Sequence, residues 1–378
     1  MGDLSKRDFT GMFCLRTVVP LAVDKHIEDQ NMVPVRHRRI PRMIPFLIMC
    51  GLACLPSYAQ YSSGTGTPED PYQIATAQDL VDLGNDPNDY DKYFILTADI
   101  DLSGYTFKQA VVASDTAPNI WGFQGTVFSG SFDGNNHKIS NLTVAGGAYL
   151  ALFGMVASQG KVSNLGIVDV NVVGTGKVHE NIGGLVGANS GSVVNCYSTG
   201  SVTGEGNVGG LVRYKSGVGG LAGSNGGSIT TSNSTNSVTG MKYVGGLVGC
   251  NTGRITTSYS TGSVTGDWRV GGLVGFNRGN LTTSYSTGVV KGIDDVGGLV
   301  GANNLLGNIR SSFWDRETSD RVTSAGGMGL TTVEIQDIDS FLNAGWDFME
   351  ETRNGTEDIW WILGGQDYPR LWWEPNEP

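Results

Sequence analysis

A tripeptide that recurs at a fixed interval most constrains what this chain can fold into. Gly-Gly-Leu recurs at spacings of 26, 10, 26, 26 and 26 residues, starting at Gly183, Gly209, Gly219, Gly245, Gly271 and Gly297. A period of this length is typical of a solenoid, in which each coil buries its apolar side against its neighbours. The single 10-residue step predicts an extra loop or a distorted coil.

The sequence within one repeat indicates short strands. The unit at 244–269 reads VGGLVGCNTGRITTSYSTGSVTGDWR, in which β-branched runs are separated by glycines. It predicts two or three strands per unit, with the glycines at tight turns. Parallel pairing of equivalent strands then gives an all-β fold, a right-handed parallel β-helix with coils of about 26 residues. We expect six or so coils in a rod on the order of 30 Å long.

Composition supports this fold class. Glycine supplies 57 of the 378 residues, and interior glycines destabilise helices. Charged residues make up only 16% of the chain and aromatic residues 9%, which argues against a disordered chain.

Two columns of equivalent residues would stack along such a coil. The first contains the asparagine that follows each Gly-Gly-Leu at a fixed distance, namely Asn189, Asn225, Asn251, Asn277 and Asn303. The second contains Tyr197, Tyr259 and Tyr285, with Phe313 at the next position. Either column could face a ligand, but we favour internal stacking because solenoids need such ladders to hold together.

The first 59 residues have the pattern of an export signal. Arginines at 36–42 precede an apolar run at 44–55, and small residues follow at the expected cleavage site before Gln60. The run is too short to span a membrane, so we expect a secreted or cell-surface protein without a membrane span after cleavage. Met32 is the start residue that gives a signal of normal length. Lipid attachment at Cys54 is a minor alternative.

Charge and cysteine content narrow the partners further. Residues 1–59 contain 8 Lys or Arg and 5 Asp or Glu, so 17 basic and 31 acidic residues remain after cleavage. Such an acidic surface repels nucleic acid, and we expect no nucleic-acid partner. Cys196 and Cys250 lie at different phases of neighbouring units, which predicts two free, partly buried thiols rather than a disulfide.

The repeat resembles a known family. The element GGLVGxNxG followed by TSYSTG, over about residues 182–314, is similar to the GLUG-motif repeats of bacterial secreted and surface proteins. The segments at 64–104 and 132–144, and the ending from Phe313 to Trp373, resemble the same group. The resemblance implies an adhesin-like protein, or a region accessory to an immunoglobulin-cleaving metallopeptidase. It implies no catalytic residue, because none belongs to the motif.

We predict four regions along the chain. They are an N-terminal extension and signal peptide at 1–59, an N-terminal cap with irregular coils at 60–145, the β-solenoid at 146–314 and a tryptophan-rich C-terminal cap at 315–378.

Local patterns also predict elements outside the repeats. We expect a helix at 75–83 with Thr76 as its N-cap, and a helix at 332–343 that begins with a capping box. Strands are expected at 93–102, 138–144, 148–156, 359–363 and 369–373.

No catalytic pattern is complete. His179-Glu180 begins a zinc-protease motif, but Gly183 stands where the second histidine is needed. Asp99, Asp101 and Ser103 imitate the start of a calcium loop that lacks its closing glutamate, so we interpret them as turn residues. Charges in the repeats are scattered, which indicates solvated loops rather than a polysaccharide-cleaving site. We therefore expect no metal and no cofactor.

Tryptophans concentrate near the C-terminus. Trp360, Trp361, Trp372 and Trp373 could stack on sugar rings, although packing of a cap on the last coil is the preferred explanation. Each adjacent pair would point to opposite faces of a strand, which leaves one ring of each pair exposed.

The sequence thus predicts an exported, non-enzymatic β-solenoid, adhesin-like or structural, on the bacterial cell surface. Surface glycans or other cell-surface proteins are the partners we consider. Two alternatives stay open: a carbohydrate-binding protein that uses the aromatic cap or a solenoid face, and a polysaccharide-active β-helix enzyme.

Overall fold

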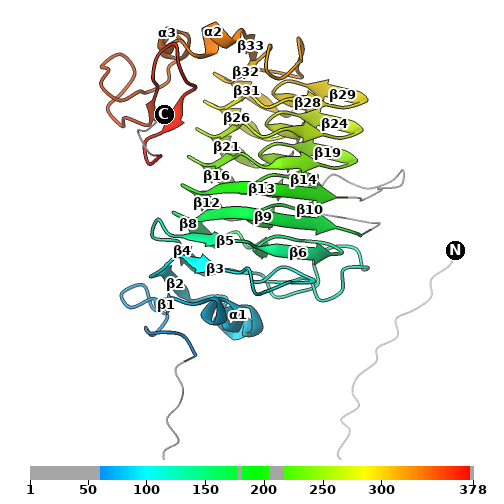
Figure 1. Cartoon of the computed structure of the whole chain (residues 1–378), viewed down its shortest axis with the longest axis vertical. Helices are drawn as coiled ribbons and strands as arrows, with labels where there is room; N and C mark the ends of the chain where they lie inside the picture. Colours follow the sequence, from blue (N-terminus) through cyan, green and yellow to red (C-terminus); the bar gives the residue numbers. More distant parts are fainter. Residues whose placement is uncertain (1–59, 177–180, 205–216, 375–378) are drawn as a thin grey trace, which may run out of the picture. The chain divides into compact units, whose positions relative to one another are not determined.

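The chain forms a stack of coils in which equivalent strands pair in parallel (Figure 1). The computed structural model describes residues 60–176, 181–204 and 217–374, and all of them lie in one compact unit. The stacked parallel sheets confirm the predicted all-β, β-helix fold. The expected signal peptide, Met32, Cys54, and the His179-Glu180 pair lie outside the described residues.

Four parallel sheets run along the stack. Sheet I contains β1 (Tyr72–Ile74), β2 (Tyr93–Leu96), β4 (Ser131–Asp133), β8 (Lys161–Ser163), β12 (Ser192–Val194), β16 (Ser228–Thr230), β21 (Arg254–Thr256), β26 (Asn280–Thr282) and β31 (Asn308–Arg310). Sheet II contains β10 (Asn181–Ile182), β14 (Gly217–Gly219), β19 (Lys242–Gly245), β24 (Trp268–Gly271) and β29 (Asp294–Gly297). Sheet III contains β7 (Phe153–Val156), β11 (Val186–Asn189), β15 (Ala222–Asn225), β20 (Val248–Asn251), β25 (Val274–Asn277) and β30 (Val300–Asn303).

Sheet IV closes each coil. It contains β3 (Ile100–Asp101), β5 (Lys138–Ser140), β6 (Thr143–Gly146), β9 (Gly166–Gly174), β13 (Tyr197–Gly204), β17 (Asn233–Ser234), β18 (Ser237–Thr239), β22 (Tyr259–Ser260), β23 (Val264–Thr265), β27 (Tyr285–Ser286), β28 (Val290–Lys291), β32 (Phe313–Asp315) and β33 (Met328–Leu330).

The pairing register reproduces the sequence period. Ile229 pairs with Ile255, and Ile255 pairs with Leu281, so each step is 26 residues. Asn189 pairs with Asn225, a step of 36 residues. The ten extra residues therefore lengthen one coil and do not add another. The nine described strands of sheet I also exceed the six or so expected coils, because strands before the repeats pair into the same sheet.

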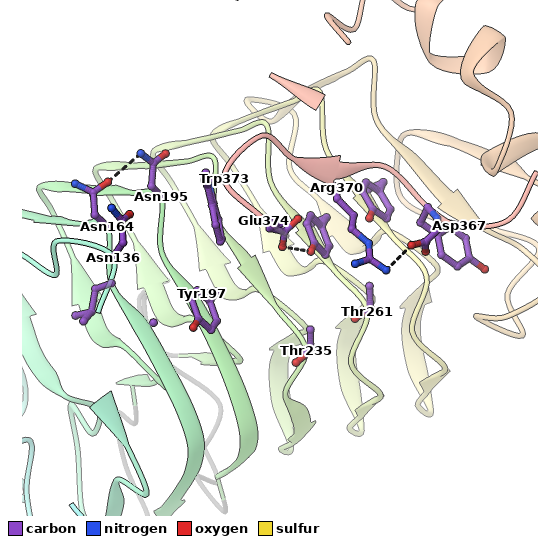
Figure 2. A pocket seen from close by; sticks show the side chains of 15 residues that line it. Asn136, Asn164, Asn195, Tyr197, Thr235, Thr261, Asp367, Arg370, Trp373 and Glu374 are labelled. Atoms are coloured by element: carbon purple, nitrogen blue, oxygen red, sulfur yellow. Dashed lines mark hydrogen bonds and ion pairs between the residues drawn. The ribbon is translucent and has the colours of Figure 1, made fainter. Parts of the chain in front are cut away.

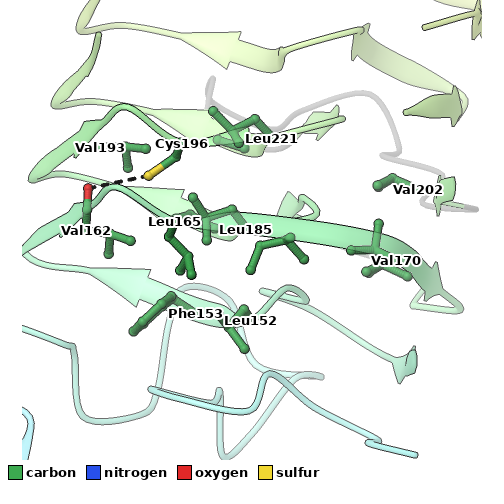
Figure 3. Packing of buried hydrophobic residues seen from close by; sticks show 14 of the residues in the cluster. Leu152, Phe153, Val162, Leu165, Val170, Leu185, Val193, Cys196, Val202 and Leu221 are labelled. Carbon is green, nitrogen blue, oxygen red and sulfur yellow. Dashed lines mark hydrogen bonds between the residues drawn. The ribbon is translucent and has the colours of Figure 1, made fainter. Parts of the chain in front are cut away.

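Apolar columns fill the interior of the coils. Among the described residues, the leucine of each Gly-Gly-Leu is fully buried, and so is its equivalent in an earlier coil: Leu152, Leu185, Leu221, Leu247, Leu273 and Leu299. Figure 3 shows Leu185 and Leu221 packed near Val193 and Cys196 in the same interior. Burying one such side chain contributes roughly 1.5–3 kcal/mol, so each coil depends on its neighbours for stability. Cys196 and Cys250 form no disulfide, as predicted, but both are fully buried where partial burial was expected.

The second glycine of each Gly-Gly-Leu serves close packing. A Cβ atom at Gly246 would lie 2.2 Å from Oγ of Ser260, and one at Gly220 would lie 2.0 Å from Oγ of Ser234. Neither glycine adopts a positive φ. Both glycines stand at the bend between sheets II and III, as predicted for turn positions. Their lack of a side chain also lets opposite walls of the coil approach.

Residues with side chains occupy the left-handed turn conformations instead. At the corner between sheets I and IV, φ is 45° at Thr231, 52° at Thr257 and 51° at Thr283. Asn164 and Asn195 hold the same corner in earlier coils, each with a φ of 53°. Asparagine tolerates this conformation better than β-branched threonine, so the threonine corners carry more backbone strain.

A helix covers the first coil, at the bottom of the stack in Figure 1. α1 (Ala77–Asn85) has Thr76 as its N-cap, as predicted, within a capping box with Asp79, and it ends two residues after the predicted bound of 83. η1 (Pro87–Asp89) follows it. Leu80 and Leu83 of α1 are fully buried.

Several strand predictions need shorter bounds. The expected strand at 93–102 is interrupted between β2 and β3, because the chain there passes from sheet I to sheet IV. The expected strand at 138–144 likewise divides into β5 and β6, and only 153–156 of the strand at 148–156 forms β7.

The C-terminal cap differs in detail from its prediction. The capping box at Thr331 and Glu334 is present, but the expected helix at 332–343 is two helices, α2 (Thr332–Ile335) and α3 (Ile338–Leu342). Asp337 accepts a hydrogen bond from the backbone N–H of Asp339, which starts the second helix separately. The two predicted aromatic strands shrink to an antiparallel pair, β34 (Trp360–Trp361) and β35 (Arg370–Leu371).

Candidate functional site

The last described residues run back along the side of the coils instead of covering only the end of the stack. Tyr285 donates a hydrogen bond from its hydroxyl to the carbonyl of Pro369. One coil earlier, Tyr259 donates to the carboxylate of Glu374. Nε1 of Trp373 donates to the carbonyl of Thr231, at 3.2 Å. The segment at 367–374, which we call the C-terminal strap, therefore crosses successive coils (Figure 2).

The strap lies on the tyrosine column. Tyr197, Asn233, Tyr259, Tyr285 and Phe313 are paired in register along sheet IV. The rings of Tyr259 and Tyr285 stack with centroids 4.9 Å apart. Together with the cap they form an apolar cluster separate from the interior core. The column thus packs on the outside of the coils, as a base for the cap.

Asn233 interrupts the tyrosine column, and the strap fills the gap. Trp373 stacks beside Tyr197, with ring centroids 5.8 Å apart. Glu374 accepts a hydrogen bond of 2.6 Å from Nδ2 of Asn233. Burial raises the pKa of Glu374, although hydrogen bonds from Tyr259 and from the backbone of Leu371 act in the opposite direction. Burial is also the main cause that raises the pKa of Tyr259 well above its ordinary value.

A groove of about 570 Å³ opens between the strap and the coils. Trp373 and Tyr197 line its centre, as Figure 2 shows. Arg370 and Asp367 form an ion pair at one end of the groove. Its size falls within the range of small-ligand sites, and its lining combines aromatic rings with convergent polar groups.

Asparagines line the other end of this groove. Nδ2 of Asn195 donates to Oδ1 of Asn164 at 3.0 Å, and Nδ2 of Asn164 donates to Oδ1 of Asp133 at 3.0 Å. Asn136 lies beside them. Asn164 and Asn195 stand 31 residues apart, outside the 26-residue period, so the period did not predict that they lie side by side. The common strand-Asn-turn context of VSNLG and VVNCY was the signal that could have revealed it.

The predicted asparagine ladder is a chain of amide hydrogen bonds. Each Nδ2 donates to Oδ1 of the asparagine in the next coil, at 2.8–2.9 Å. The first four members, Asn189, Asn225, Asn251 and Asn277, are buried, while Asn303 at the end is exposed. The ladder satisfies buried polar groups, which matches internal stacking better than a ligand surface.

The four candidate tryptophans have different surroundings. Trp360 and Trp361 are both buried, so the expectation that one of them is exposed is wrong. Trp360 packs on Trp346 with centroids 4.6 Å apart, and Nε1 of Trp361 donates to the carbonyl of Leu371. The cap thus covers both faces of β34.

In the other pair one ring is more exposed than its neighbour, as predicted, but both residues lie in a turn after β35 and not on a strand. The side chain of Trp372 is 51% exposed, whereas Trp373 is half-buried in the groove. Trp373 is therefore the candidate that the structure brings to a cavity.

The acidic turn at 99–103 is engaged by the next coil. Asp99 accepts hydrogen bonds from Nδ1 of His137 and from the backbone N–H of Lys138, and the latter is the largest cause that lowers its pKa. Asp101 accepts from Ser103 and Asn141. These contacts support the structural interpretation. Among the described residues, no group of three or more His, Cys, Asp or Glu side chains is placed to hold a metal ion.

Comparisons with known proteins bear on both repeat and fold. The family of the GLUG motif matches residues 179–203 and 242–265. A crystal structure from Bacteroides ovatus, of a protein that bears the name of an immunoglobulin A1 protease, superposes with a TM-score of 0.61. It is 22% identical and covers 84% of this chain and 96% of its own, so this likeness concerns the fold alone.

Two curated relatives match part of the chain. Halomucin of Haloquadratum walsbyi is 33% identical over 161 residues, which make up 40% of this chain and 2% of that protein. A Gly-rich membrane protein of Evansella cellulosilytica is 30% identical over 142 residues, 36% of this chain and 15% of that protein. The chain thus spans a small part of each. The chain thus carries two matches to the GLUG motif within a stack of parallel β-sheets.

Proposed function

We propose that this chain is an exported, non-enzymatic protein of the cell surface, in which the β-helix is a rigid structural or adhesin-like module. The observation that carries this proposal is the buried asparagine ladder, which joins successive coils along one line of amide hydrogen bonds. Such a ladder resists bending and slippage between coils, as a spacer requires. Relatives named as a mucin and as a membrane protein support the surface location. No described helix is long and apolar enough to cross a membrane.

Shaving intact cells with a protease tests the location. Cells that produce the chain with an epitope inserted at Gly364, which has open space around it, should lose the epitope signal on treatment. A cytoplasmic marker serves as the control and should stay intact. Retention of the epitope in intact cells, with loss only after lysis, would contradict the proposal.

Enzyme assays test the proposal that the chain is not an enzyme. The purified chain should release no reducing ends from acidic or neutral polysaccharides and should not cleave immunoglobulin A1. Cleavage of either substrate by the purified chain would overturn it.

The groove at Trp373 supports a second candidate function, the binding of carbohydrate. The indole of Trp373 and the phenol ring of Tyr197 supply apolar faces, while the amides at Asn164 and Asn195 supply donors and acceptors. This is the combination that a sugar requires, because its ring carries both C–H faces and hydroxyl groups.

A glycan array separates this function from a purely structural role. Trp373→Ala should abolish binding, whereas Trp372→Ala should preserve it, because Trp372 does not line the groove. Trp361→Ala is unsuitable, since that ring is buried in the cap. Melting temperatures of both variants show whether the strap stays docked. Glycan binding that survives Trp373→Ala would exclude the groove.

A further inference from the structure

The groove at Trp373 extends along the stack of coils. Asn136, near one end of the groove, lies in the turn before β5, and Thr261, towards the other end, follows β22. The strands pair in the order β5, β9, β13, β17 and β22, so four coil steps separate the two residues. At the spacing of paired strands, this part of the groove covers roughly 19 Å along the stack. A single sugar ring cannot fill a groove of this length.

The tyrosine column lacks a ring on each side of Tyr197, which opens the groove at this point. The paired position is Gly166 in the preceding coil and Asn233 in the following one. A Cβ atom at Gly166 would lie 2.3 Å from Cζ of Tyr197, so the phenol ring lies over this glycine. Tyr259 and Tyr285 are buried beneath the cap and its strap, whereas Tyr197 is only half-buried. Of these three tyrosines, Tyr197 is the one whose ring can meet a ligand.

Trp373 is held in place beside Tyr197. Its Nε1 atom donates to the carbonyl of Thr231, which fixes the indole against the coil. The planes of the two rings are inclined by only 25° to each other. Side chains that are already ordered lose little conformational entropy when a ligand binds. The two rings therefore form a preorganised apolar centre in the groove.

Polar side chains line the groove in the coils on both sides of this centre. The amides of Asn136 and Asn164 belong to the two coils before Tyr197, and Figure 2 shows them at one end of the groove. The hydroxyl groups of Thr235 and Thr261 belong to the two coils after it. Thr235 is exposed and Thr261 is half-buried, so a ligand in the groove can reach both. Hydrogen-bonding groups are therefore available to sugars on either side of the one at Tyr197.

The length of the groove and the order of its groups define the form of the ligand. We propose that the groove holds several linked sugar residues of a linear glycan, laid along the coils. One sugar packs at Tyr197 and Trp373, and its neighbours meet the amide of Asn136 on one side and the hydroxyl group of Thr261 on the other. This inference rests on the carbohydrate-binding function proposed above for the same groove, and it adds that the ligand is an extended chain rather than a single sugar.

Calorimetry with the full chain and glycans of increasing length tests the proposal. The probes are linear oligosaccharides of glucose, xylose, mannose and N-acetylglucosamine, each from the disaccharide to the hexasaccharide. In at least one series the affinity should rise tenfold or more from the shortest probe to the longest, a factor of ten being about 1.4 kcal/mol. Equal affinities along every series that binds would overturn this inference and leave the carbohydrate-binding function standing. Failure of every probe to bind would overturn both.

Variants at the two ends of the groove separate reach from folding. Asn136→Gly removes an amide at a residue whose φ is 62°, which glycine adopts freely, and Thr261→Val removes a hydroxyl group with little change of shape. Each should weaken the hexasaccharide at least threefold more than the disaccharide, because only the longer chain reaches these residues. Trp373→Ala should weaken both lengths, and Trp372→Ala, outside the groove, should weaken neither. End variants that weaken both lengths equally, or neither, would refute the extended mode of binding.

Discussion

Glu374 accepts a hydrogen bond from the hydroxyl of Tyr259, although 115 residues separate the two in the chain. The same carboxylate oxygen accepts from Nδ2 of Asn233 in the preceding coil. A single carboxyl group thus joins the C-terminal strap to two neighbouring coils.

This contact predicts a pH dependence. Because burial raises the pKa of Glu374 in the folded chain, the folded state binds its proton more tightly than the unfolded state does. Its contribution to stability is therefore complete below the unfolded pKa of about 4.3 and is lost as the pH rises through the folded pKa. Relative to Glu374→Gln, the parent chain should melt at a higher temperature at pH 4 than at pH 8. A difference between the two chains that is the same at both pH values would contradict this assignment.

The asparagine ladder should be sensitive at its centre and tolerant at its end. Asn251→Ala removes the amide that donates to Asn277 and accepts from Asn225, and it leaves both partners buried without this hydrogen bond. We expect a loss of about 1–3 kcal/mol in the free energy of unfolding, measured by denaturant titration. Asn303→Ala is the matched control and should cost less, because Asn303 is exposed and ends the series. Equal costs at the two positions would show that the ladder adds little to stability.

Close packing at the second glycine of Gly-Gly-Leu predicts that one added methyl group lowers the stability of the fold strongly. In Gly246→Ala the new Cβ would lie 2.2 Å from both the carbonyl oxygen of Gly272 and Oγ of Ser260. Thermal melting should show a destabilisation of about 1–3 kcal/mol or more. Gly104→Ala is the control, since no atom outside its neighbours lies within 4 Å of its added Cβ, and it should melt close to the parent chain. A well-tolerated alanine at 246 would refute the packing argument.

Strain at the threonine corner predicts a stabilising substitution. Thr257 has a φ of 52°, in a conformation that asparagine adopts more readily than threonine. Thr257→Asn should therefore raise the free energy of unfolding by roughly 1 kcal/mol. Thr265→Asn, in the strand β23, serves as the control and should be neutral or slightly destabilising. No gain at 257, or an equal gain at 265, would mean that corner strain is not what limits stability.

Burial of Cys196 predicts an inert thiol. Desolvation raises the pKa of this thiol to about 12, and the side chain is fully buried. At pH 8 a thiol-specific reagent should not modify Cys196 in the folded chain, but it should do so after unfolding in denaturant. Mass spectrometry of the peptide that contains Cys196 reports the modification. Rapid labelling under native conditions would show that this coil opens easily.

The periodic part of the structure could be predicted from the sequence because equivalent positions of successive repeats have the same surroundings. Leu247 and Leu273 are both fully buried, and Asn251 and Asn277 belong to the same hydrogen-bonded ladder. The period of the sequence therefore gives the register in which the strands pair. The bend at Gly246 could be predicted from the glycine pattern, whereas its close contact with Ser260 could not, because the sequence does not show which residue approaches a glycine. The left-handed residues at Thr257 and Thr283 give no signal, since threonine is usual in extended strands.

The candidate sites were harder to predict from the sequence than the fold was. Trp373 was a candidate by composition, but its contacts with Thr231 and Tyr197 join segments more than 140 residues apart and follow no period.

The C-terminal strap also has a kinetic consequence. A linear array of coils usually loses its structure from the ends, one layer after another, because each layer contacts only its neighbours. Here Trp373 stacks on Tyr197, and Pro369 is bound three coils further on, at Tyr285. The outermost coils on that side cannot come apart singly without releasing the strap from the whole group. We therefore expect these coils to open as one cooperative block, so that amide hydrogen exchange along them should occur at a single common rate.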